Sequence, residues 1–160
     1  MLTDAQVDDI WKRMVKAEVR SLYYADLASS YAREKRFITF VTFFSSSAAV
    51  ATIVAKLHPA IPGCLSVIGA LLAAYSIAMG LDKRAETLMK LHHQWNALYA
   101  EYFRLWNHWN EGEAEKTLEA LIVKAMEASD LGTVEDPKDG KRLEAWTKKV
   151  FAQYNEEAAA

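Results

Sequence analysis

The chain has 160 residues, enough for one domain of ordinary size, and its 25% of charged residues and net charge of −2 resemble those of a soluble protein. Cys64 is the only cysteine, which excludes a disulfide framework and a thiolate metal cluster. Residues 82–160 hold 11 Lys and Arg against 15 Asp and Glu, and this excess of negative charge argues against direct binding of nucleic acid.

Residues 3–36 are predicted to form one amphipathic helix on the cytoplasmic side. Either Thr3 or Asp4 can cap its start, and no glycine or proline interrupts the chain before Pro59. The pattern predicts that the helix continues without a break into the next segment. Residues of its apolar face recur at three- and four-residue steps and are Val7, Ile10, Met14, Ala17, Ser21, Tyr24, Ala28 and Tyr31.

Two long runs without any ionisable side chain follow, at residues 37–55 and 60–81. As helices they would be about 28 and 33 Å long, close to the ~30 Å hydrocarbon core of a bilayer. Central helices of a soluble bundle are the alternative, but such helices normally keep a polar face toward water, and neither run has a charge. We therefore predict two transmembrane helices, which the short loop at residues 56–59 makes antiparallel neighbours.

Basic residues flank the two runs unequally. Five lie next to the outer ends, whereas the loop has only Lys56 and, at low pH, His58. Because basic residues near a membrane span tend to stay in the cytoplasm, both termini are predicted to be cytoplasmic. The five residues are Arg33, Lys35, Arg36, Lys83 and Arg84.

Residues 82–110 are predicted to form a coiled-coil helix. Large side chains keep strict three-four spacing over three heptads, the pattern of an a/d seam. The partner is either the helix at residues 3–36 of the same chain or a helix of another copy. A homo-oligomer is expected, because one partner helix is too narrow to cover the seam. The candidate oligomer seam is Leu88, Leu91, Trp95, Leu98, Tyr102, Leu105 and Trp109.

Two shorter helices are predicted at residues 113–129 and 141–155. The first is expected to stop near Gly132, and residues 133–140 (TVEDPKDG) are rich in turn formers and are predicted to be a linker. The predicted fold is all-α: a two-span transmembrane helical hairpin extended into a cytoplasmic helical bundle or coiled coil. Residues 1–160 are predicted to form a single domain.

Small and hydroxylated residues occupy one side of the first run, within an arc of about 140° at about 100° per residue. One interpretation is that these hydroxyls bond to carbonyls one turn earlier and that the face packs against another helix. The other is that several copies turn this face inward to line a pore, since two spans from one chain cannot enclose a water path. The candidate pore-lining residues are Thr42, Ser45, Ser46, Ala49 and Thr52; Phe37, Phe40, Phe43 and Phe44 lie outside that arc.

The second run has a face of small residues, among them Gly69 and Ala73. Small residues four apart let helix backbones approach closely in lipid. This face is therefore expected to pack against a neighbouring helix.

Catalytic and metal-binding chemistry is not indicated. The sequence has no phosphate-binding glycine loop, HExxH motif or nucleophile elbow, so no catalytic, cofactor or metal residues are assigned and an enzyme is not expected. His92 and His93 are adjacent, and on a helix they diverge by about 100° and cannot both face one metal. No Asp, Glu, Lys or Arg lies inside either run, which excludes proton-coupled transport and voltage sensing.

The order of elements combines three features. A basic-aromatic junction at residues 31–37 (YAREKRF) precedes a two-span hairpin with a minimal loop, and a long helix with aromatic and histidine positions follows at residues 92–103 (HHQWNALYAEYF). This layout resembles that of the SLATT domains, two-span bacterial membrane modules linked to antiphage and conflict systems. The resemblance covers roughly residues 15–155.

The resemblance implies an oligomeric effector in the bacterial inner membrane that forms pores and kills or arrests an infected cell. Such domains are often encoded beside nucleotide second-messenger synthases, nucleotide-sensing domains or reverse transcriptases, so a separately encoded cytoplasmic sensor or defence component is an expected partner. Unlike the fused SLATT proteins, these 160 residues are expected to contain no sensor domain. The alternative function is a non-conducting membrane scaffold that anchors a cytoplasmic partner through its coiled-coil helices, and the lack of a charged filter favours it.

Overall fold

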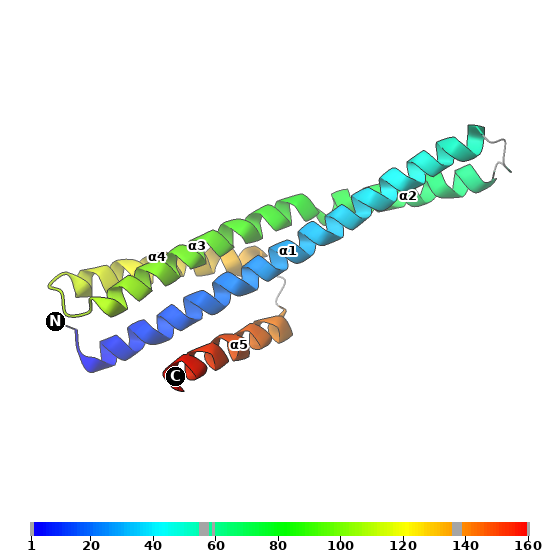
Figure 1. The fold of residues 1–160 in the computed structure, drawn as a ribbon. Coiled ribbons are helices and arrows are strands. Elements are labelled where there is room, and N and C mark those ends of the chain that lie inside the picture. The colour runs from blue at the N-terminus through cyan, green and yellow to red at the C-terminus, as the bar shows by residue number, and fades with distance from the viewer. Residues whose placement is uncertain (1, 55–57, 59, 136–138, 160) are drawn as a thin grey trace. The chain divides into compact units, whose positions relative to one another are not determined.

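The computed structural model describes residues 2–54, 58, 60–135 and 139–159, and all regular secondary structure in this part of the chain is helical (Figure 1). The predicted all-α class is confirmed for these residues. The helices are α1 (Asp4–Val54), α2 (Ala60–Met79), α3 (Leu81–Asn107), α4 (Ala114–Glu135) and α5 (Gly140–Ala159).

The helices form two compact units. Unit 1 comprises Met1–Leu27 and Thr87–Ala160, and unit 2 comprises Ala28–Glu86. Both α1 and α3 contribute residues to each unit. Most of the buried apolar side chains belong to unit 1, whereas unit 2 exposes many of its own.

A capping box starts α1. The backbone N–H of Thr3 donates to Oε1 of Gln6 at 2.8 Å, and the N–H of Gln6 points back to Oγ1 of Thr3 at 3.4 Å. This reciprocal pair satisfies backbone donors that have no partner inside the helix. The helix has 51 residues and contains neither glycine nor proline, so nothing in its sequence interrupts the hydrogen-bond ladder. The prediction that residues 3–36 and the first apolar run form one helix is confirmed as far as Val54.

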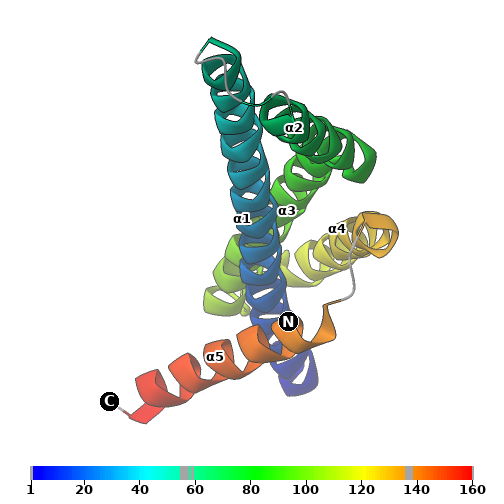
Figure 2. The ribbon, with the colours of Figure 1, turned by 90° about the vertical axis from the view of Figure 1, so that its right-hand side faces the viewer.

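Unit 1 is a bundle in which α3, α4 and α5 all contact the first part of α1 (Figures 1 and 2). Arg20 of α1 donates to the Ser129 hydroxyl of α4 at 3.1 Å. Nδ1 of His92 on α3 lies 2.9 Å from the carbonyl oxygen of Ser21. The same nitrogen lies 3.0 Å from the Ser21 hydroxyl oxygen, so His92 joins α3 to α1 through Ser21.

The predicted oligomer seam of α3 is a packing face inside the single chain. The helix ends at Asn107, so the prediction that it reaches residue 110 is wrong, and Trp109 lies beyond its end and is 39% exposed. The six other members are at most 5% exposed. Arg20 of α1 lies 4.5 Å from the centre of the Trp95 ring, and Lys124 of α4 donates to Glu101 of α3 at 2.7 Å. Two helices of the same chain therefore pack on α3, and burial of the seam needs no second copy. Contact between copies through the seam stays a prediction, and it requires uncovering Leu88, Leu91, Trp95, Leu98, Tyr102 and Leu105 first.

The fourth helix continues past residue 129 to Glu135, so the expected stop near Gly132 is wrong. A Cβ atom at position 132 would lie 2.6 Å from the hydroxyl oxygen of Tyr24. The glycine therefore serves the close approach of α4 to α1 rather than ending the helix.

We expect Gly132→Ala to lower the stability of unit 1 by about 1–3 kcal/mol, because the added methyl group overlaps the Tyr24 hydroxyl. Helix propensity alone favours alanine by about 1 kcal/mol, so a net loss identifies the clash. Tyr24→Phe removes the hydroxyl and leaves ring carbon Cζ 3.6 Å from the methyl group, an ordinary contact. Thermal unfolding of the detergent-solubilised single and double variants should give a double variant more stable than the sum of the single losses. Strictly additive losses would contradict the proposed contact.

The last helix is also longer than predicted. It begins at Gly140, where the carboxylate of Asp139 accepts the backbone N–H of Arg142 at 3.1 Å, and it continues past residue 155 to Ala159. The Tyr154 hydroxyl donates to Glu18 of α1 at 2.6 Å, which fastens α5 to the bundle. The predicted linker at residues 133–140 is too long, because residues 133–135 belong to α4 and Gly140 belongs to α5. Residues 136–138 lie outside the described residues.

Unit 2 contains the packed pair of α1 and α2. The Tyr75 hydroxyl of α2 donates to Glu34 of α1 at 3.0 Å. The second apolar run is not one helix to residue 81, since α2 ends at Met79 and Gly80 has a φ of 57° before α3 begins at Leu81. That left-handed conformation costs other residues about 1–2 kcal/mol, so a glycine marks the point where the apolar helix gives way to the charged one.

Candidate functional site

A large apolar surface covers unit 2. The four phenylalanines of α1 are 64–73% exposed, and Ile77 of α2 is 81% exposed. Soluble monomers rarely leave so many large apolar side chains in water, and a surface of this kind marks contact with lipid or with other chains. We call it the unit 2 apolar surface; its members are Phe37, Phe40, Phe43, Phe44, Val50, Ile61, Val67, Ile68, Leu71 and Ile77.

The second helix is apolar all round and yet almost entirely exposed, with Gly69 as its buried residue. Among the described residues, one helix is long and apolar enough to cross a bilayer, and it starts at Ala60. Only 11% of its most apolar 18-residue segment is buried. The core helix of a soluble protein has a similar composition but is mostly buried, so this low burial separates α2 from that alternative. Within the described residues, the first predicted span at residues 37–55 does not meet the same requirement of length and apolar composition.

The hydroxylated face of α1 meets α2 in the single chain. Ser45 is 5% exposed, and a Cβ built on Gly69 lies 3.9 Å from its Cβ. Ser46 is exposed, and its hydroxyl donates to the carbonyl oxygen of Thr42 at 2.9 Å, one turn earlier. Both observations agree with the packing interpretation of this face.

Three candidate pore-lining residues can thus be placed. Thr42 is half-buried, and its hydroxyl has no hydrogen-bond partner within the described part of the chain. Ser45 faces α2, and Ser46 is exposed. The side chains of Ala49 and Thr52 lie outside the described residues.

A groove of about 700 Å³ lies at the end of the unit 2 apolar surface that is nearer to the basic junction. Phe40 contributes to its apolar part, and Lys35 and Arg36 contribute to its charged part. Lys35 is paired with Asp82, whereas Arg36 makes no ion pair among the described residues. This change from aromatic to basic side chains is typical of the boundary between hydrocarbon and lipid headgroups.

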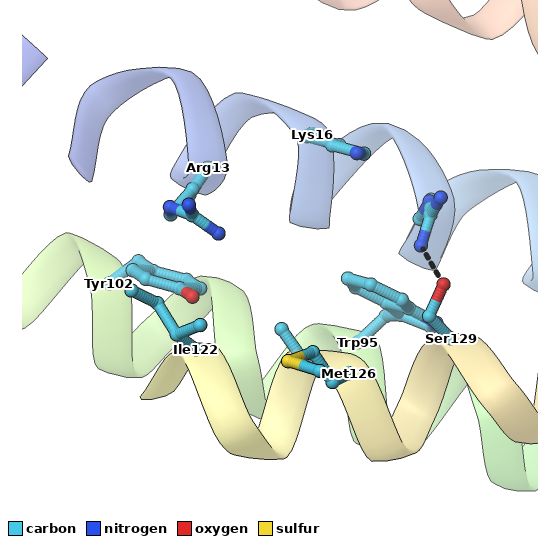
Figure 3. A pocket seen from close by; sticks show the side chains of 9 residues that line it. Arg13, Lys16, Trp95, Tyr102, Ile122, Met126 and Ser129 are labelled. Atoms are coloured by element: carbon cyan, nitrogen blue, oxygen red, sulfur yellow. Dashed lines mark hydrogen bonds between the residues drawn. The ribbon is translucent and has the colours of Figure 1, made fainter. Parts of the chain in front are cut away.

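A second candidate site lies in unit 1, where a pocket of about 150 Å³ is lined by α1, α3 and α4 (Figure 3). Arg13, Lys16 and Arg20 are spaced by three and four residues, so they share one face of α1, and all three line the pocket. Trp95 and Tyr102 line it from α3. The sequence pattern placed these two aromatic residues in the seam, whereas the three basic residues were not predicted to be part of a site. Their spacing was visible, but basic residues on a helix usually face solvent, and only the fold shows what they face.

Comparison with known proteins assigns no family. No protein-family model matches the chain, and neither does any curated protein or solved structure. Within the described residues no group of three or more His, Cys, Asp or Glu side chains is placed to hold a metal ion.

Proposed function

We propose that this protein is an integral membrane protein of the bacterial inner membrane, with residues 37–55 and α2 as its two spans and both termini in the cytoplasm. The exposure of α2 carries the proposal, because an apolar helix that is not covered by its own chain requires lipid or other copies around it. The change from Phe40 to Lys35 and Arg36 along α1 supports the position of the cytoplasmic boundary.

The proposed activity is that of an oligomeric, pore-forming effector that disrupts membrane integrity in antiphage defence. Two spans cannot enclose a water path, so several copies are needed, and the unit 2 apolar surface offers contacts between them. The arrangement with Ser45 against Gly69 is then the closed state. Opening parts α1 from α2 and turns the hydroxylated face of α1 toward the water path. The resemblance of the sequence layout to that of SLATT domains supports this activity and a separately encoded sensor as partner.

Induced expression in bacteria loaded with a membrane-potential dye tests the effector. Wild-type protein should depolarise the cells, and Ser46→Leu should reduce the depolarisation because it replaces an exposed hydroxyl by a group that dries the path. Phe40→Leu, which changes an exposed position of the same helix outside the hydroxylated arc, should leave most of the depolarisation intact at matched protein levels. Equal losses in both variants would show that the hydroxylated face only packs.

A non-conducting scaffold is the second candidate function. Val123, Met126 and Leu131 of α4 are 53–62% exposed, which offers a cytoplasmic partner an apolar surface. If wild-type protein never depolarises cells, even during phage infection with its native neighbours present, the effector proposal fails and the scaffold replaces it.

A further inference from the structure

The pocket between α1, α3 and α4 has an excess of positive charge. Arg13 is paired with Asp9 at 2.6 Å, and Arg20 donates to the neutral Ser129 hydroxyl. Lys16 makes no ion pair within the described part of the chain. The positive charge of Arg20, followed by burial and the charge of Arg13, lowers the pKa of Lys16. Three cationic side chains thus line one pocket, and among the described residues only Arg13 has a carboxylate partner.

Two residues that line the pocket each have a buried donor without a partner among the described residues. Trp95 is 3% exposed and Tyr102 is 1% exposed, and neither Nε1 of Trp95 nor the Tyr102 hydroxyl forms a hydrogen bond in the described part of the chain. Figure 3 shows the Tyr102 hydroxyl at the end of its ring that faces Trp95. Burial raises the pKa of Tyr102, so it keeps its proton and remains a donor at neutral pH. A buried donor left without an acceptor costs about 1–3 kcal/mol, which an incoming acceptor would recover.

We propose that this pocket binds the phosphate group of a small phosphorylated molecule. A phosphate has several acceptor oxygens and up to two negative charges, which match the cations of α1 together with the donors of Trp95 and Tyr102. The pocket has a volume of about 150 Å³, and a cavity of this size can hold a benzene molecule. It therefore accommodates a phosphate group while the rest of the ligand stays outside. A bound phosphate links α1, α3 and α4 in one contact. The site does not depend on the pore proposal.

The test measures thermal unfolding of the full-length protein in neutral detergent, with pyrophosphate as the probe at constant ionic strength. Pyrophosphate should raise the Tm in a saturable manner, because a ligand of the folded state stabilises it by mass action. Lys16→Gln should weaken the apparent affinity about tenfold or more, as expected for loss of a charged hydrogen bond. Lys116→Gln, which changes an exposed lysine of α4 paired with Glu113, should bind like wild type.

Tyr102→Phe separates binding from folding. The Tyr102 hydroxyl proton has no acceptor among the described residues, so the Tm without pyrophosphate should stay unchanged or rise, while the affinity for pyrophosphate falls. A second arm repeats the measurement in nanodiscs of neutral lipid with or without phosphatidate. Stabilisation by pyrophosphate in neutral discs assigns a soluble phosphorylated ligand, and Lys16-dependent stabilisation by phosphatidate alone assigns a lipid headgroup. The proposal is overturned if neither probe raises the Tm, or if Lys116→Gln weakens binding as much as Lys16→Gln.

Discussion

Val67→Lys is expected to prevent stable membrane insertion, whereas Val123→Lys should have almost no effect. Val67 of α2 is 58% exposed and Val123 of α4 is 55% exposed. The same substitution is therefore made at two equally exposed positions, of which the first is proposed to face lipid and the second water. A lysine well inside a membrane helix costs about 3 kcal/mol on insertion scales. A lysine at a water-exposed helix position changes stability by about 0.5 kcal/mol or less. Sodium carbonate extraction of membranes, followed by immunoblotting of pellet and supernatant, measures the difference.

The matched pair makes this result specific to lipid. If both variants remain in the carbonate-resistant pellet like wild type, α2 does not lie in the hydrocarbon core. If both are lost equally, the substitution acts through general misfolding. Proteinase accessibility of unit 1 in the Val123→Lys variant provides the folding control.

A disulfide between positions 45 and 69 is expected to hold the protein closed. A Cβ on Gly69 lies 3.9 Å from that of Ser45, within the range that disulfides require, and makes only ordinary contacts there. We expect Ser45→Cys with Gly69→Cys to form an intramolecular bond on mild oxidation. Cys64 is exposed and is replaced by alanine in all variants, so that no other thiol competes.

Depolarisation of induced cells is the readout of this lock. A disulfide contributes about 2–4 kcal/mol to the state it closes, which reduces the open population by roughly 30-fold or more. The oxidised double variant should therefore lose depolarisation, and a reducing agent should restore it. Each single-cysteine variant should depolarise under both conditions. A fully cross-linked double variant that still depolarises cells would show that the pore does not open between α1 and α2.

Several features of the fold follow from local sequence alone. The Thr3 cap and the absence of glycine and proline up to Val54 are sufficient to predict one long α1, because capping and helix propagation depend on near neighbours in the chain. The seam of α3 is likewise visible as a period of three and four residues, and burial of six of its members is confirmed. Glycine was a weaker guide to the ends of helices. Gly80 interrupts a run that was predicted to be one helix, whereas Gly132, near which a helix was predicted to stop, lies inside α4.

Only the tertiary structure decided what the apolar and small-residue faces of the helices pack against. A periodic pattern shows that a side chain is suited to burial, but not which helix buries it. The seam of α3 was therefore compatible with the first helix of the same chain or with another copy, and in the structure α1 and α4 of the same chain pack there. The packing of Ser45 on Gly69 and the approach of Tyr24 to Gly132 depend on residues distant in sequence. The pocket proposed to bind phosphate has the same origin, because its cations lie on α1, and the donors that have no partner among the described residues lie on α3. Local sequence determines helices and their faces, whereas contacts between helices determine the sites.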